Sequence, residues 1–332
     1  MSTRRIEELD GLRGIAAMLV VIYHYTFRFA EKFDTDIITK HFNFKYGHYG
    51  VELFFIISGF VIFMSIDKIK SPFEFVYKRF VRLYPTFWFC MILTFVIVII
   101  SDVLILKVSF ADFLMNFTML PSVLNFKEVD GVYWTLKIEL FFYLLILFLL
   151  IFKKSDKNLI LGFIYILIGV VSLLFYRIIY DYYYGLFFII GINFYHIWKQ
   201  RGTLWHHLQI FLCLWLTINK GDSILFISSA IFIIMFYLII NKKLKFISNF
   251  YFLFIGKISY ALYLIHQNIG YVIQLKMIEF KIDNFLLLIL IPIFVSIVIA
   301  SIITFYIEKP VIAFLNNYYQ KVAVNKFVKS AE

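Results

Sequence analysis

Long apolar stretches recur from one end of the chain to the other, with short polar segments between them. Their cores include Ile15–Tyr23, Tyr84–Ile100, Leu140–Phe152 and Phe285–Ile307. A helix needs about 20 mainly apolar residues to cross the hydrocarbon layer of a bilayer. The pattern therefore predicts an all-α bundle of about ten transmembrane spans. We place these spans at 12–30, 48–66, 84–101, 134–152, 159–177, 182–198, 203–219, 223–240, 255–274 and 285–307.

The composition also indicates an integral membrane protein. Of the 332 residues, 62% are apolar and only 16% are charged, whereas soluble domains average about 25% charged residues. A soluble protein of this length could not bury so much apolar surface in its core. The composition therefore excludes an ordinary soluble enzyme.

The formal net charge of +11 raises the question of nucleic-acid binding, but the positions of Lys and Arg argue against it. Most of them fall in the N-terminal segment, in alternate loops and in the C-terminal segment. These segments share one side of the membrane if the N-terminus is cytoplasmic, and cytoplasmic loops carry such an excess. We predict an inner (cytoplasmic) membrane protein with both termini in the cytoplasm. Its basic charge then reflects topology and lipid contact, not nucleic acid.

Cysteine usage and the start of the chain add two expectations. Cys90 and Cys213 both fall within apolar segments, so no disulfide framework is expected. The acidic residues Glu7, Glu8 and Asp10 precede the first apolar stretch, and no small-residue cleavage site follows it. The first span is therefore expected to stay in the mature protein.

The chain shows no internal repeat and no Pro/Gly/Ser-rich linker. We therefore expect residues 1–332 to form a single membrane domain without a fused soluble domain. The longest outer loop, 102–133, contains an apolar stretch broken by Pro121. That pattern fits either a position on the outer membrane surface or re-entry into the membrane.

Ionisable side chains inside membrane spans are costly and mark candidate functional sites. The first span carries Arg13 near its inner end and His24 about 16 Å further along the helix. The fourth span carries Glu139 about 8 Å below its outer end, at a depth similar to that of His24. We predict that His24 and Glu139 pair, because a carboxylate would fix the imidazole tautomer for a general base acting on a hydroxyl. A histidine that only packs between helices, or a proton-relay pair, fits the same residues.

The second span opens with the residues GVELFFIISGF. Glu52 lies just below the predicted outer surface, where facing lipid is disfavoured but the interface can hydrate it. Ser58 and Gly59 lie deeper, and we interpret Gly59 as a packing position because small residues let helices approach closely. Glu52 and Ser58 are candidates for a substrate-binding or supporting role.

The segment KRFVRLYP precedes the third span. Arg79 and Arg82 are three residues apart and share one face of a helix. Guanidinium groups suit bidentate contact with phosphate, although ordinary positive-inside charge fits the same spacing. Pro85 is expected near the start of the helix, where proline is tolerated.

The ninth span contains GKISYALYLIHQ. Tyr260, Tyr263 and His266 recur at intervals of three and therefore share one face. Such a polar stripe inside a span faces a cavity or a neighbouring helix. These residues are candidates for substrate binding or for packing.

The motifs together resemble the acyltransferase-3 family of bacterial membrane acyltransferases, which modify O-antigen, capsule, exopolysaccharide and related glycans. The matching blocks follow the family's order along almost the whole chain: LDGLRGIAAMLVVIYHY, GVELFFIISGF, KRFVRLYP, YWTLKIELFFY, ISYALYLIH and YIEKP. The resemblance implies that His24 is the catalytic histidine and that Glu139 is the acidic residue of the Trp-to-Tyr block. It also implies that Arg13, Arg79 and Arg82 serve an acyl-coenzyme A donor.

By resemblance, the donor is acetyl-coenzyme A or another acyl-coenzyme A, the acceptor is a glycan, and no metal is expected. The chain differs from two-part family members in lacking a fused extracytoplasmic domain, so a separate extracytoplasmic transferase is a possible partner. It also carries Lys137 where the family more often has a small polar residue. Two rival functions are a secondary transporter or flippase, and a non-catalytic membrane partner that keeps the fold. Inverted repeats would favour a transporter, and the sequence shows none.

Overall fold

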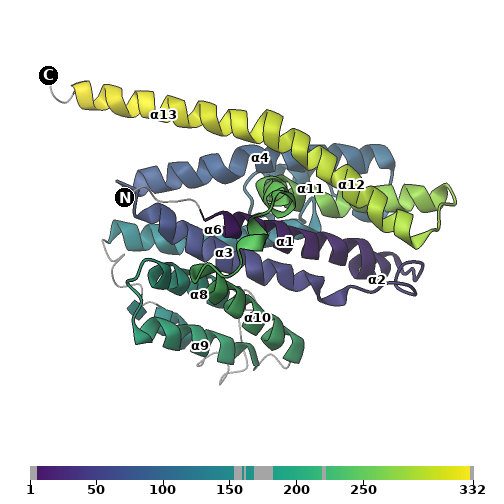
Figure 1. The fold of residues 1–332 in the computed structure, drawn as a ribbon. Helices are drawn as coiled ribbons and strands as arrows, with labels where there is room; N and C mark the ends of the chain where they lie inside the picture. The colour runs from purple at the N-terminus through teal and green to yellow at the C-terminus, as the bar shows by residue number, and fades with distance from the viewer. Residues whose placement is uncertain (1–5, 153–158, 161, 168–181, 219–221, 330–332) are drawn as a thin grey trace. The chain divides into compact units, whose positions relative to one another are not determined.

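The chain folds into helices that form two compact units. The computed structural model describes residues 6–152, 159–160, 162–167, 182–218 and 222–329. Over these residues the regular secondary structure is entirely helical (Figure 1), which confirms the all-α prediction. The first unit comprises Met1–Pro72 and Trp134–Ser259, and the second comprises Phe73–Tyr133 and Tyr260–Glu332.

The first unit begins with one long helix. In it, α1 (Glu7–Tyr23) continues through a π-helical turn (His24–Arg28) into α2 (Phe29–Phe33). The remaining elements of this unit are a 3-10 turn (Lys45–Tyr49), α3 (Gly50–Ile66), α6 (Trp134–Ile151), α8 (Tyr182–Trp198), α9 (Leu204–Ile218), α10 (Ser223–Ile240), a second 3-10 turn (Lys245–Ser248) and the start of α11 (Phe250–Glu279).

Helices α3 and α8 of the first unit pack closely against each other (Figure 1). A Cβ atom added to Gly59 would collide with the backbone of Phe188, and one added to Gly191 would collide with the carbonyl oxygen of Ile56. The two backbones approach because neither glycine has a side chain. This confirms the interpretation of Gly59 as a packing position.

The second unit is built around two very long helices, α4 (Pro72–Ser101) and the rest of α11. After α4 come a 3-10 turn (Leu104–Leu106), α5 (Phe110–Asn116) and two further 3-10 turns (Pro121–Leu124 and Gly131–Tyr133). The last long helix consists of α12 (Phe285–Ile303), a π-helical turn (Thr304–Glu308) and α13 (Lys309–Lys329). It starts where the Asn284 side chain accepts hydrogen bonds from the first free backbone N–H groups.

Helix α4 begins earlier than the sequence predicted. It starts at Pro72, a residue that suits the first helical position because it lacks an N–H group. Pro85 consequently lies inside the helix and not near its start, so the carbonyl of Val81 lacks its usual helical donor. The predicted span 84–101 counted only the apolar run, at whose start Pro85 does lie. The polar turns before it are helical too, with an ion pair of 2.7 Å between Lys78 and Glu74.

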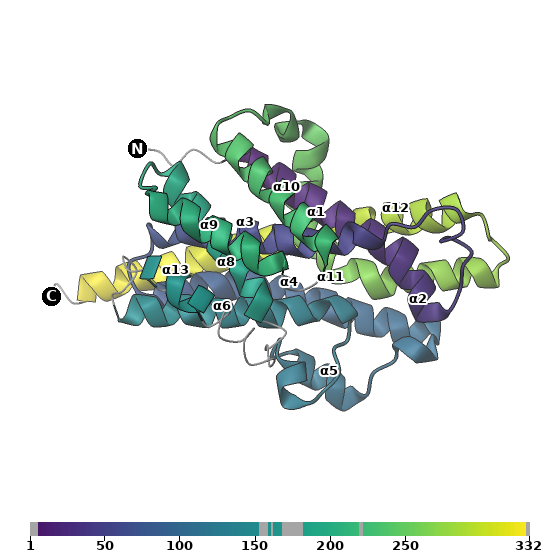
Figure 2. The same ribbon diagram turned by 90° about the horizontal axis from the view of Figure 1, so that it is seen from below.

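The segment after α4 folds back along that helix (Figure 2). The ring of Phe113 in α5 stacks on Phe95 with 4.1 Å between centroids. Further on, Trp88 Nε1 donates a hydrogen bond of 3.0 Å to the Phe117 carbonyl. Trp88 lies about 20 Å from Ser101 along the helix axis. The segment therefore packs along α4, and its position relative to the membrane stays a prediction.

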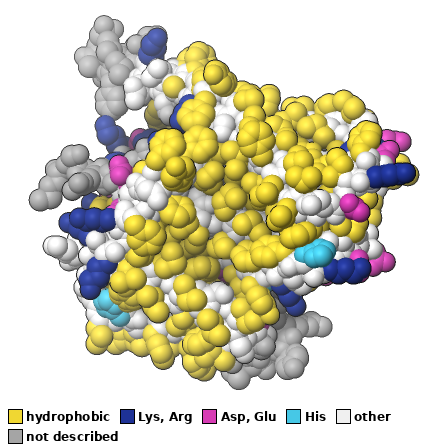
Figure 3. Space-filling view, turned by 45° about the vertical axis from the view of Figure 1, so that its right-hand side comes forward, with side chains coloured by type: hydrophobic (Ala, Val, Ile, Leu, Met, Phe, Trp, Pro, Cys, Tyr) yellow, Lys and Arg dark blue, Asp and Glu magenta, His cyan; other side chains and the backbone are white. Residues whose placement is uncertain are grey.

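Among the described residues, five helices are long and apolar enough to cross a membrane: Lys45–Ile66, Pro72–Ser101, Gly131–Ile151, Ser223–Ile240 and Phe285–Lys321. Each of these helices corresponds to a predicted span. On the face of the molecule drawn in Figure 3, hydrophobic side chains cover most of the surface. Leu204–Ile218 is apolar but shorter. The predicted spans 12–30, 182–198 and 255–274 fall in the α1–α2 helix, in α8 and in α11. Residues 161 and 168–177 of the predicted span 159–177 lie outside the described residues.

Candidate active site

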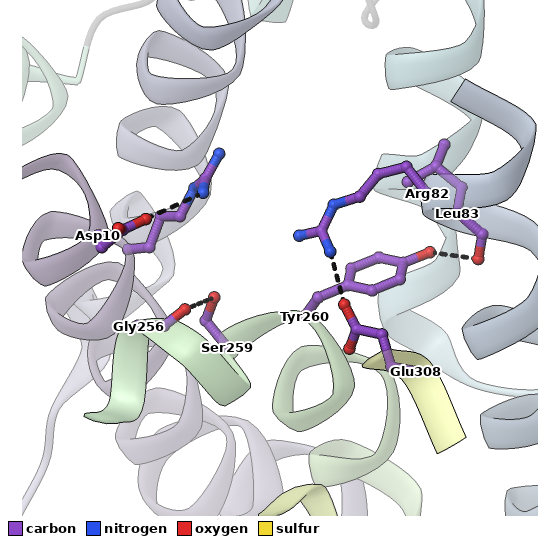
Figure 4. Close-up of polar contacts among 8 residues, drawn as sticks. Asp10, Arg82, Leu83, Gly256, Ser259, Tyr260 and Glu308 are labelled. Carbon is purple, nitrogen blue, oxygen red and sulfur yellow. Dashed lines mark hydrogen bonds and ion pairs between the residues drawn. The ribbon is translucent and has the colours of Figure 1, made fainter. Parts of the chain in front are cut away.

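Arg13 and His24 lie on the same long helix of the first unit. Arg13 Nη1 is 3.4 Å from Asp10 Oδ1 (Figure 4). His24 is buried and opens the π-helical turn, and π turns within α-helices often mark functional positions. Its Nδ1 lies 2.8 Å from the carbonyl oxygen of Val20. Because a carbonyl only accepts, Nδ1 donates in this contact, and in the neutral form of the ring the lone pair is then on Nε2.

Glu139 of α6 joins α3 through a part-buried hydrogen-bond cluster in the first unit. Ser58 Oγ donates to Glu139 Oε1 at 3.0 Å, and the Tyr143 hydroxyl donates to the same oxygen. Among the described residues, Glu139 accepts hydrogen bonds from these two hydroxyls. Its pairing with His24 stays a prediction. Glu52, at the start of α3, is only 4% exposed and is therefore buried in the protein and not turned to lipid.

Arg82 in the second unit is held by an acidic and an aromatic side chain (Figure 4). Its Nη1 lies 2.5 Å from Oε1 of Glu308, the last residue of the second π turn. Its guanidinium lies over the Tyr260 ring, 5.2 Å from the centroid. The Arg82 side chain is 41% exposed, whereas that of Glu308 is 5% exposed. Arg79, one turn earlier, lies over the ring of Phe75. Both arginines therefore pack their guanidinium groups against aromatic faces.

The polar stripe on α11 faces the interior of the second unit. The Tyr260 hydroxyl donates to the Leu83 carbonyl at 2.9 Å, and the Tyr263 hydroxyl donates to the Val132 carbonyl at 3.3 Å. His266 is fully buried, and its Nδ1 lies 2.8 Å from the Tyr263 carbonyl oxygen. The two tyrosines thus tie α11 to α4 and to the 3-10 turn before α6. Both tyrosines therefore have packing contacts, and their role in substrate binding stays a prediction.

Two buried acids were missed as candidate residues. Glu308 lies at the end of an apolar run, and that position is the signal by which it could have been found. Asp130 carries no such signal, because it lies in the segment 102–133, which the sequence predicts to be an outer loop. Yet Asp130 is fully buried, and its carboxylate accepts hydrogen bonds from the backbone N–H groups of Val132 at 3.2 Å and Asn268 at 2.9 Å. The partner on α11 is distant in sequence, so local spacing gives no hint of it.

The structure brings together some candidates and leaves others apart. In the first unit Ser58 and Glu139 are in contact, and in the second unit Arg82 and Tyr260 are in contact. Arg13 lies in the first unit, whereas Arg79 and Arg82 lie in the second. Their joint action on one donor stays a prediction.

The helical fold, its long apolar helices and its buried ionisable side chains define a polytopic membrane protein with polar groups in its interior. A family model for the acyltransferase domain matches residues 6–306, and the chain belongs to the acyltransferase-3 family. The resemblance drawn from the sequence motifs is thereby confirmed. The protein is a membrane acyltransferase. No curated protein and no solved structure matches the chain.

Proposed function

We propose that this acyltransferase moves an acyl group, most simply acetyl, from cytoplasmic acyl-coenzyme A to a hydroxyl of a glycan. The glycan is a cell-surface or lipid-linked polymer of the lipopolysaccharide or exopolysaccharide kind. Family membership supports the reaction class. The observation that carries the mechanism is the contact of His24 Nδ1 with the Val20 carbonyl, because it makes Nε2 the basic nitrogen of a neutral, buried ring.

In the proposed reaction, His24 Nε2 takes the proton of a sugar hydroxyl while the hydroxyl oxygen attacks the thioester carbon. The carbon–sulfur bond then breaks, and the departing coenzyme A thiolate takes the proton from the imidazolium. Ester and free thiol are the products, and no net proton is released. An acyl-histidine intermediate, formed by attack of Nε2 on the thioester carbon, is the alternative route.

For the donor, we propose that Arg13, Arg79 and Arg82 hold the phosphate groups of coenzyme A. A guanidinium presents five N–H donors, so an arginine that binds a carboxylate still has donors for a phosphate. Arg82 supports this proposal because its side chain is 41% exposed while one of its nitrogens binds Glu308. Glu308 then fixes the guanidinium in a single orientation.

The test is acyl transfer by the purified protein in liposomes, with labelled acetyl-coenzyme A and a panel of glycan acceptors. We expect acceptor-dependent release of free coenzyme A. His24→Ala should lower the rate on the order of a hundredfold to ten-thousandfold, the range of general-base catalysis. His207→Gln is the matched control, because this exposed histidine of the first unit bonds only to a neighbouring tyrosine among the described residues.

Near-normal acylation by His24→Ala would remove this residue from the chemistry and leave His266 as the next histidine to test. If the wild type released no coenzyme A with any acceptor, the transferase proposal would fail. Uptake of a glycan by the same liposomes would then favour the transporter.

A further inference from the structure

A cavity of 570 Å³ lies at the end of the long first helix of the first unit. Its lining comes from α2, from the π turn and from the loop that follows, and includes Phe27, Asp34, Thr35, Thr39 and Asn43. Small-molecule sites typically measure about 300–1,000 Å³ and combine apolar walls with a few polar groups. The size and the mixed lining fit a small polar ligand.

The chain turns back sharply where α2 ends, and this turn forms the cavity. Asp34 has a φ of 50° and a ψ of 51°, and its N–H donates to the Ala30 carbonyl. Asp is among the few residues other than glycine that adopt this left-handed conformation readily. The turn leads the following loop back so that Thr39 and Asn43 share the cavity with Phe27.

The charges around the cavity argue against a cationic ligand. Glu31 forms an ion pair with Arg28, and Asp36 forms one of 2.8 Å with Lys40. The described residues contain no group of three or more side chains arranged to hold a metal ion. Most of the negative charge at the rim is thus compensated by neighbouring cations.

Several polar side chains of the lining remain available to a ligand. Asp34, Thr39 and Asn43 make no side-chain hydrogen bond to any residue that the structure describes. Together they offer a carboxylate, a hydroxyl and an amide, and hydroxyl groups of a ligand donate to and accept from such groups. The ring of Phe27 adds an apolar wall. A sugar has the matching chemistry, with hydroxyls around its edge and an apolar C–H face.

An aromatic path connects this cavity to His24. The Phe27 ring stacks on Tyr23 with 6.0 Å between centroids, and Tyr23 meets the His24 ring edge-on at 4.9 Å. Phe27 follows His24 by three residues, a rise of about 4.5 Å along the helix. Two successive ring contacts therefore link the cavity wall to the proposed base, which does not itself line the cavity.

We propose that this cavity is an acceptor subsite that binds one sugar residue of the glycan, next to the residue whose hydroxyl reaches His24. Asp34, Thr39 and Asn43 recognise the hydroxyls of that sugar, and Phe27 packs against its C–H face. This assignment rests on the proposed function, since it names where the acceptor of that reaction binds.

The kinetic test uses Thr39→Val/Asn43→Ala and Asp34→Asn in the purified full-length protein. Asn tolerates the left-handed backbone, so Asp34→Asn removes the charge and keeps the turn. Loss of two hydrogen bonds should raise the acceptor KM about tenfold. The kcat at saturating acceptor and the KM for acetyl-coenzyme A should stay unchanged, as expected when binding alone is lost. Asp283→Asn, an exposed acid of the other unit, is the matched control.

The second test is independent of catalysis and uses saturation-transfer NMR with glucose, galactose and N-acetylglucosamine. Wild-type protein should give a signal with at least one of these sugars, and Thr39→Val/Asn43→Ala should lose it. Normal acylation with an unchanged acceptor KM in the variants would overturn the subsite and leave the proposed function intact. A sugar signal that depends on Thr39 and Asn43, without any acylation, would support the subsite while the proposed function fails. Equal signals in wild type and variant, or none in either, would also overturn the subsite.

Discussion

The hydrogen-bond partners of Glu139 differ from those that its position in the sequence indicates. A lone carboxylate within an apolar span looks like a partner for the nearest ionisable group at the same depth. In the structure, Ser58 and Tyr143 both donate to one of its oxygens, so the carboxylate is held at the junction of α3 and α6. The two hydrogen bonds tie these two helices together at this point.

If Glu139 and Tyr143 act as one unit, their losses should not multiply. Tyr143→Phe removes one hydrogen bond of about 1 kcal/mol and should lower acylation about fivefold. The double variant Glu139→Gln/Tyr143→Phe should be little worse than Glu139→Gln alone, measured as kcat under saturating donor. Tyr237→Phe, which removes a hydroxyl that contacts the exposed His207, is the control. If the loss of kcat in the double variant equalled the product of the two single losses, Glu139 and Tyr143 would not act as one unit.

The sequence identified the ionisable candidate residues of the first unit better than it identified their contacts. His24, Glu52 and Glu139 stand out because each interrupts an apolar run, a local signal that one sequence carries. The partner of Glu139 on α3 is 81 residues away, and spacing within a helix says nothing about it. The tautomer of His24, by contrast, depends on the Val20 carbonyl of its own helix. The predicted pairing of His24 with Glu139 is a separate matter and stays a prediction.

At the scale of whole elements, α4 and the π turn before α13 meet through the pair of Arg82 and Glu308. Glu308 is buried and Arg82 is 41% exposed, so solvent screens the pair only from one side. Arg82→Ala would leave a buried carboxylate without its cation. That change weakens folding as well as any contact to a donor phosphate, so the single variant does not separate the two roles.

A second substitution separates these roles. Arg82→Ala should lower the free energy of unfolding by on the order of 2 kcal/mol, because a buried charge loses its partner. Arg82→Ala/Glu308→Gln should recover part of this loss in thermal unfolding. The KM for acetyl-coenzyme A should stay raised in both variants if Arg82 holds phosphate. A normal donor KM in the double variant would assign Arg82 to folding and topology alone.

The contact between α3 and α8 gives a prediction about stability. Adding a methyl group at Gly191 places it against the Ile56 carbonyl, and neither helix backbone has room to yield. Gly191→Ala should therefore cost about 1–3 kcal/mol, the usual range for overpacking. Thermal unfolding in detergent measures this loss, with Ala111→Val at an exposed position of α5 as the control. An unchanged unfolding temperature would mean that α3 and α8 separate freely.

For the molecule as a whole, the sequence predicted the helical class and the places of the long apolar helices, because apolar length is a direct physical requirement of the bilayer. It did not predict that the segment after Ser101 returns along α4, since either placement satisfies the same apolar pattern. Nor did it predict that segments 73–133 and 260–332 form one compact unit. Contacts such as Tyr263 to Val132 define that unit, and they join parts of the chain that no local pattern relates.

The last prediction concerns topology, because both the donor side and the acceptor subsite depend on it. Basic residues concentrate in the termini and in alternate loops, and such segments stay in the cytoplasm. A reporter fused after Glu332 or inserted near Lys243 should therefore be active only on the cytoplasmic side. A single cysteine introduced at Asp36, with Cys90 and Cys213 replaced, should react with a membrane-impermeant maleimide from outside. If the C-terminus proved to be external, the number of crossings would be odd. If Asp36 were labelled only from the cytoplasm, the cavity beside Phe27 would face the donor side and would be no place for a surface glycan.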